Sequence, residues 1–185
     1  MKVSPRILAF VAVGLGVSAL IVGSKRGPTV DFDELARTVE REEDHVDAVE
    51  LGRWLMEKKH GLRIVDIRSA EDYAAFHLPK AENIQLGSIN RLEVKPGQTV
   101  VLYSDGGTHA AQAWFILRAR GFRNVYFLRG GLTEWMDEVM APIAPVDART
   151  REVMEYFGGL PQPAGTVRSF ESVKDRVKAL KKRTC

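Results

Sequence analysis

The chain has 185 residues, of which 45% are hydrophobic and 28% charged, and its net charge is +3 at pH 7. This length suits one folded domain with appendages, and so small a charge does not by itself indicate any class of partner. The single cysteine, Cys185, is the last residue. One chain can therefore hold no disulfide framework, zinc site or CxxC redox pair, and we expect neither a metal nor a cofactor.

Residues 1–27 are predicted to form a single-pass membrane anchor. Ile7–Val22 carries no charge, and basic residues lie on both sides of it (Lys2, Arg6, Lys25 and Arg26). The run is at the short limit of a membrane span, which needs about 17–25 residues, and is slightly long for a signal-peptide core of about 7–15. We favour the anchor over a cleaved signal, which would leave an exported or periplasmic protein. Basic residues on both sides leave the orientation open.

A linker at residues 28–44, with a helix at Asp31–Arg41, precedes a region in which strand and helix patterns alternate. Strands are expected around Val46 and at Arg63–Ile67, Asn83–Ile84, Thr99–Tyr103 and Asn124–Leu128. Helices are expected at Ala48–Lys59, between Ser69 and Pro79, from His109 to Gly121, and from a Thr133 cap to Pro142, with a surface connection at Gly87–Lys95. Such alternation predicts a parallel sheet covered by helices on both faces.

Thr99–Gly121 is the stretch where we expect any chemistry to lie. A β-branched and apolar strand leads into the polar loop Ser104–Thr108, and a helix follows from His109. A loop between a strand and a helix N-terminus makes a cradle of N–H groups, which can bind an anion or hold a nucleophile. Ser104 follows the carboxyl end of its strand, and ligands of open parallel sheets bind at that edge.

Residues 143–185 are expected to form a helical extension with a basic tail. Asp147–Tyr156 should be helical, and Arg168–Arg183 combines an apolar stripe with many lysines and arginines. This basic amphipathic helix either rests on an anionic membrane surface or docks on its own domain, and the second is slightly favoured. Nucleic-acid binding is not expected, because neither a motif nor interleaved aromatic residues accompany the basic ones.

Six short pieces of residues 45–142 form a recognisable pattern, namely Val65–Arg68, Glu71–Tyr73, His77–Ile84, Val100–Gly107, Gly121–Val125 and Gly130–Trp135. Through these pieces the region resembles a rhodanese-like (sulfurtransferase homology) domain. Their order and separations, rather than any one piece, carry the likeness. The resemblance implies an α/β sandwich around a five-stranded, mostly parallel sheet flanked by helices. The predicted N-terminal membrane helix would be added to it.

The resemblance also implies a loop of the form Cys-Arg-x-Gly-x-Arg/Thr in members that are enzymes, where the cysteine holds sulfane sulfur as a persulfide. The aligned loop here consists of Ser104, Asp105, Gly106, Gly107, Thr108 and His109, of which only Gly107 keeps the family residue. A serine oxygen is a weak nucleophile without a general base and cannot store sulfur as a persulfide. The Asp105 carboxylate also opposes an anionic donor.

Several side chains around this loop have structural and functional interpretations. Asp66 and His77 match family positions and are expected to organise loops by hydrogen bonding. Arg68 is expected to form a structural ion pair, although with Arg129 it could help the loop to bind an anion without chemistry. A hydrolytic pair of Ser104 and His109 is disfavoured, because neighbouring loop positions direct their side chains apart.

The sequence therefore predicts a membrane-anchored, non-catalytic rhodanese-like domain that acts as a binding or regulatory module. Its partner would be an unknown protein or a small anion. The alternative is an active thiosulfate or persulfide sulfurtransferase with an atypical loop, or with Cys185 as the sulfur carrier.

Overall fold

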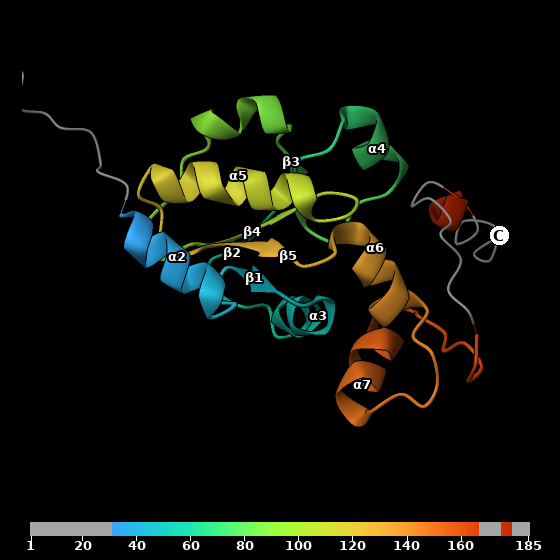
Figure 1. Cartoon of the computed structure of the whole chain (residues 1–185). Coiled ribbons are helices and arrows are strands. Elements are labelled where there is room, and N and C mark those ends of the chain that lie inside the picture. The colour runs from blue at the N-terminus through green and yellow to red at the C-terminus, as the bar shows by residue number, and fades with distance from the viewer. Residues whose placement is uncertain (1–30, 167–174, 179–185) are drawn as a thin grey trace, which may run out of the picture. The chain divides into compact units, whose positions relative to one another are not determined.

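The structure is a computed structural model that describes residues 31–166 and 175–178. A five-stranded sheet lies at the centre of these residues (Figure 1). The order across the sheet is β1 (His45–Val46), β5 (Val125–Leu128), β4 (Thr99–Tyr103), β2 (Leu62–Asp66) and β3 (Ala81–Asn83). Each neighbouring pair is parallel; Val101 of β4, for example, pairs with Ile64 of β2 and Tyr126 of β5. The predicted parallel sheet is confirmed.

Helices cover both faces of this sheet (Figure 1). One face carries α2 (Phe32–Glu40), the 3₁₀-helix η1 (Leu86–Arg91) and α5 (Thr108–Ala119), and the other carries α3 (Ala48–Met56), α6 (Gly131–Trp135), the π-helical turn η2 (Met136–Met140) and α7 (Ala148–Tyr156). The short helix α4 (Ala70–Ala75) connects β2 to β3. Strand β4 therefore lies in the middle of both the sheet and the layers.

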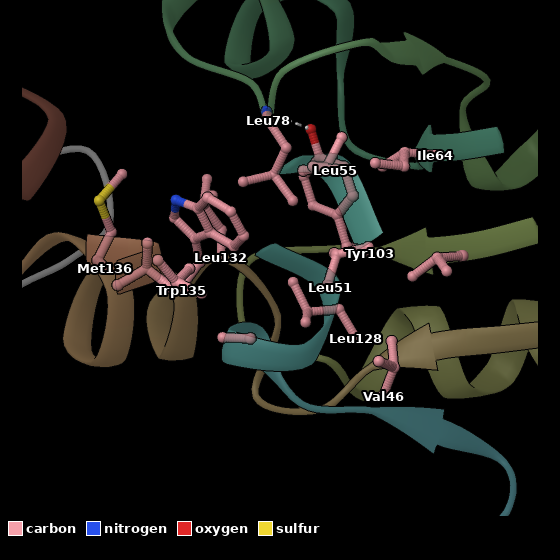
Figure 2. Packing of buried hydrophobic residues seen from close by; sticks show 14 of the residues in the cluster. Val46, Leu51, Leu55, Ile64, Leu78, Tyr103, Leu128, Leu132, Trp135 and Met136 are labelled. Atoms are coloured by element: carbon pink, nitrogen blue, oxygen red, sulfur yellow. Dashed lines mark hydrogen bonds between the residues drawn. The ribbon is translucent and has the colours of Figure 1, made fainter. Parts of the chain in front are cut away.

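Alternate residues of β4 build the two halves of the core. Val101 and Tyr103 belong to the cluster under α3 and α6, whereas Val100 and Leu102 belong to the cluster under α5. This alternation follows from the two-residue period of a strand. All four residues are fully buried, as expected for a central parallel strand with both faces covered. Figure 2 shows Tyr103 among the leucines of the first cluster, with its hydroxyl turned toward Leu78.

Helix ends show where local sequence decided the structure and where it did not. Ser69 caps α4 by accepting from the N–H of Asp72, as the capping pattern predicted. The prediction that Thr133 caps the next helix is wrong. The helix begins at Gly131, after Gly130 in the left-handed conformation, and Thr133 donates its hydroxyl to the Asp105 carbonyl instead.

Other boundaries also differ from expectation. Helix α4 ends at Ala75, before the predicted stop at Pro79, because the chain is already extended at Phe76. The predicted surface connection Gly87–Lys95 contains most of η1, which buries Ile89. Apolar burial against α5 explains why this connection is ordered.

The chain outside the sheet region is described only in part. The predicted anchor at residues 1–27 lies outside the described residues, and within 31–166 and 175–178 no helix has the length and apolar character to span a membrane. Of the predicted helix Arg168–Arg183, residues 175–178 are described and helical. Val177 is buried in the first core cluster, and Arg176 pairs with Asp137.

Candidate functional site

The loop after β4 makes the turn from the central strand into α5. The chain leaves the sheet at Tyr103 and passes through residues 104–107, and Gly107 adopts a φ of 86° just before the helix begins. No side chain caps this helix. The N–H groups of its first turn therefore lack an acceptor within the helix, and they leave a donor-rich surface at its N-terminus.

The start of α6 holds this loop in place. The N–H of Leu132 donates to the Ser104 carbonyl at 2.9 Å, and the Asp105 carbonyl accepts from both the N–H and the hydroxyl of Thr133, at 2.9 and 3.0 Å. Gly131 allows this approach, because a Cβ there would lie 2.3 Å from the Ser104 carbonyl oxygen. The loop conformation is thus imposed by a segment 27 or 28 residues further along the chain.

A pocket of about 470 Å³ opens beside the loop at the carboxyl edge of the sheet. Its lining consists of Ile67, Arg68, Ser69, Asp72, Leu86, Ser104, Asp105, Gly106, Thr108 and His109. Most of the predicted site residues therefore come together. Gly107 and Asp66 do not line it, because Gly107 packs on Gly130 and Asp66 lies buried beside Arg68.

Ser104 is only 4% exposed, yet it lines the pocket. Within the described part of the chain no hydrogen bond uses its side chain, and in particular none joins it to His109. The sequence argument against a hydrolytic pair is consistent with this geometry. The hydroxyl is left available to a molecule in the pocket.

The Arg68 guanidinium donates its hydrogen bonds to other groups of the protein. Its Nε and Nη2 donate to the two carboxylate oxygens of Asp66 at 3.0 and 2.6 Å, Nη2 also donates to the Phe76 carbonyl, and Nη1 donates to Asp105 at 3.2 Å. Burial alone lowers the pKa of Arg68, but the hydrogen bond and charge of Asp66 outweigh it, so the pKa is raised. Arg68 is therefore a permanent cation whose charge is already balanced, in the structural ion pair expected of it.

Tyr103 extends this network beneath the loop. Its hydroxyl accepts from the N–H of Leu78 at 3.1 Å, as drawn in Figure 2. Burial raises the pKa of Tyr103, and the charge of Asp66 raises it further. Sequence reasoning did not assign Tyr103 to the site. Its one signal was its place as the last residue of a buried strand.

The remaining candidates lie apart from the pocket lining. His77 stacks on Tyr73, with ring centroids 4.0 Å apart, and its Nδ1 lies 2.9 Å from the Tyr73 carbonyl. Arg129 pairs with Glu134. Over the ranges 31–166 and 175–178, no group of histidine, cysteine, aspartate or glutamate side chains has a geometry suited to a metal.

Comparison with known proteins gives a consistent result. The family model of the rhodanese-like domain matches residues 47–138. The thiosulfate sulfurtransferase GlpE of Pseudomonas paraeruginosa is 32% identical over 99 residues, which make up 51% of this chain and 84% of that protein. A tRNA uridine(34) hydroxylase of Prochlorococcus marinus is 32% identical over 50 residues, but this chain spans only 16% of its length.

Solved structures match about half of the chain. A rhodanese-like domain protein from Staphylococcus aureus is 28% identical and aligns over 51% of this chain and 93% of its own, with a TM-score of 0.46. The rhodanese-like domain of a protein from Anabaena sp. is 26% identical over 50% of this chain and 72% of its own, also with a TM-score of 0.46.

Proposed function

This chain belongs to the rhodanese-like domain family, and on that premise we propose that its domain is a binding or regulatory module that does not transfer sulfur. The observation that carries the proposal is the absence of any cysteine from residues 47–138, the whole of the matched region. Ser104 stands at the mouth of the loop where, by the resemblance described above, active members carry their cysteine. Persulfide formation needs a thiolate, and a serine hydroxyl offers neither the acidity nor an S–S bond.

The charges around the loop support the same proposal. A thiosulfate dianion entering the pocket would meet the Asp105 carboxylate, whose side chain is 55% exposed. It would find no unbalanced cation in Arg68, since Asp66 and Asp105 already accept from that guanidinium. Two unit charges about 4 Å apart interact by about 4 kcal/mol at an effective dielectric near 20, and solvent screening reduces the value for an exposed group.

An active sulfurtransferase is the second candidate, favoured by the 32% identity to the thiosulfate sulfurtransferase GlpE. In this chain the sulfur would have to travel on Cys185, the only thiol, which lies outside the described residues. The two candidates therefore differ in whether any sulfur transfer occurs and in which residue it depends on.

A thiosulfate:cyanide assay on the full chain separates them. The natural protein should give no turnover above the rate without protein, and Cys185→Ser should change nothing. Ser104→Cys restores the thiol, and Ser104→Cys combined with Asp105→Arg also restores the charge, so turnover should rise in that order. Turnover by the natural chain that disappears in Cys185→Ser would establish the second candidate and refute the first.

Two properties of the module are part of the same proposal. Its ligand is a protein or a small molecule that enters the pocket at Ser104, and the module is held at a membrane by residues 1–27. The uncharged run Ile7–Val22 with its basic flanks supports the attachment.

A further inference from the structure

The inner surface of the pocket at Ser104 offers hydrogen-bond donors. Thr108 and His109, the first two residues of α5, line it, and no side chain accepts from the first turn of that helix. Ser104, a residue only 4% exposed, lines the same pocket, and its hydroxyl has no hydrogen-bond partner within residues 31–166 and 175–178. Backbone N–H groups at a helix N-terminus together with a hydroxyl suit a carboxylate.

The outer part of the pocket has the opposite character. The carboxylates of Asp105 and Asp72 both line it, and the Ser69 hydroxyl donates to Asp72 at 2.8 Å. Arg68, the one arginine or lysine of the lining, has its guanidinium committed to Asp66, Asp105 and the Phe76 carbonyl. Besides Arg68, His109 is the one residue of the lining whose side chain can carry a positive charge. A simple anion would thus gain from the donors and lose beside the carboxylates, and a simple cation would do the reverse.

We propose that this pocket takes a zwitterionic ligand, a small free amino acid whose carboxylate meets the donors at Ser104 and the α5 N-terminus while its ammonium meets Asp105. The proposal rests on the proposed function, because it names the ligand of the non-catalytic module. A pocket of about 470 Å³ is large enough for such a molecule. Asp105 has two roles in this arrangement: it neutralises Arg68 and selects against ligands without a positive group.

Three ligands with the same three-carbon skeleton test the charge requirement. β-Alanine carries both charges, propionate only the carboxylate and propylamine only the ammonium, on three carbon atoms each. Dissociation constants are measured by NMR titration of the full chain at one pH and one ionic strength. We expect β-alanine to bind at least about tenfold more tightly than either of the others, because each charged hydrogen bond that is lost weakens binding by roughly that factor.

Two variants then test the contacts of the ammonium and of the carboxylate separately. Asp105→Asn keeps the shape of the side chain and its carbonyl oxygen for Arg68, so the protein should fold; β-alanine should weaken about tenfold while propionate holds or improves. Ser104→Ala should weaken β-alanine and propionate by the same factor. Asp33→Asn, an exposed aspartate on α2 away from the pocket, is the matched control and should leave all three constants unchanged.

Several results would overturn the proposal: propionate binding the natural chain as tightly as β-alanine, an unchanged ratio of the two constants in Asp105→Asn, or no binding of β-alanine at all. None of these results would bear on sulfur transfer, which the thiosulfate:cyanide assay measures separately. Turnover in that assay would refute the proposed function whatever the binding data showed.

Discussion

Arg68 and Asp66 lie two residues apart in sequence and form a doubly hydrogen-bonded pair in which the side chains are 6% and 0% exposed. The pair forms at the carboxyl end of β2, and Arg68 then reaches across to the loop after β4 through Asp105, 37 residues away. The Arg68 guanidinium therefore links the end of β2 to the loop after β4. The same hydrogen bonds prevent it from acting as a free anion receptor.

Removing Arg68 should be costly to the fold. Arg68→Ala leaves the Asp66 carboxylate buried without its counter-ion, and losing one partner of such a pair destabilises proteins by about 3–5 kcal/mol. Arg53→Ala is the matched control, because Arg53 pairs with Glu57 on the surface with side chains 44% and 59% exposed; its loss should be about 0.5 kcal/mol or less. Urea unfolding of both variants measures the difference. Equal, small losses would show that the buried pair is not structural.

Tyr103 should make stability fall at high pH. Its pKa is raised in the folded chain, first by burial and then by Asp66, so the folded state keeps a proton that the unfolded state releases near pH 10. Its contribution is fully present below that pH and is lost as the pH rises above it, because the unfolded state then binds fewer protons.

Absorbance of tyrosinate checks this prediction, since the chain has four tyrosines. One of them should ionise only as the protein unfolds. Tyr103→Phe should abolish that late step, whereas Tyr156→Phe, which alters a residue 59% exposed, should leave the late step in place. Ionisation of all four tyrosines together in the folded chain would contradict the assignment.

Gly131 should be intolerant of a side chain for two separable reasons. Its φ of 58° strains any other residue, and a Cβ would meet the Ser104 carbonyl oxygen at 2.3 Å. Gly97→Ala is the control for the first effect alone, because Gly97 has a φ of 80° but nothing within 4 Å of a Cβ. Gly131→Ala should therefore lose roughly 1–3 kcal/mol more than Gly97→Ala, the usual effect of overpacking. Denaturant unfolding provides the comparison, and equal losses would mean that the loop can move away.

The elements that sequence alone predicted best are those fixed by their own residues. Strand β4 has the predicted bounds Thr99–Tyr103, because a short apolar run rich in β-branched residues favours a buried strand. The cap at Ser69 also follows from a local pattern, because its side chain accepts from the N–H of Asp72, three residues later.

The missed features depend on segments that meet only in the fold. Nothing local distinguishes Thr133 from a capping residue, yet its hydroxyl donates to Asp105, 28 positions earlier. Five of the six predicted loop residues line one pocket. The ion pair between Arg68 and Asp105, however, depends on the packing of β2 beside β4. The expectation that Asp105 opposes an anionic sulfur donor therefore gains a physical basis that the sequence pattern could not supply.

Val177 should contribute to the stability of the domain although it lies near the C-terminal end. It is 6% exposed and belongs to the cluster that contains Trp135 and Met136. Val177→Ala removes two buried carbon atoms, for which a loss of about 1–2 kcal/mol is expected. Val39→Ala, which alters a residue 50% exposed on α2, should lose much less. Thermal unfolding of the two variants side by side measures this, and indistinguishable midpoints would show that the segment does not pack on the domain.

Residues 1–27 should attach the chain to a membrane. After lysis and an alkaline wash that strips peripheral proteins, the full chain should stay with the membrane fraction, whereas a chain that begins at residue 28 should be released. The basic C-terminal segment is the competing cause of attachment, because clustered lysines and arginines bind anionic lipids. A chain that lacks residues 167–185 should therefore remain attached through the wash. Release of the chain that lacks residues 167–185 would assign the attachment to the basic segment. Release of the full chain would show that neither segment holds it at the membrane.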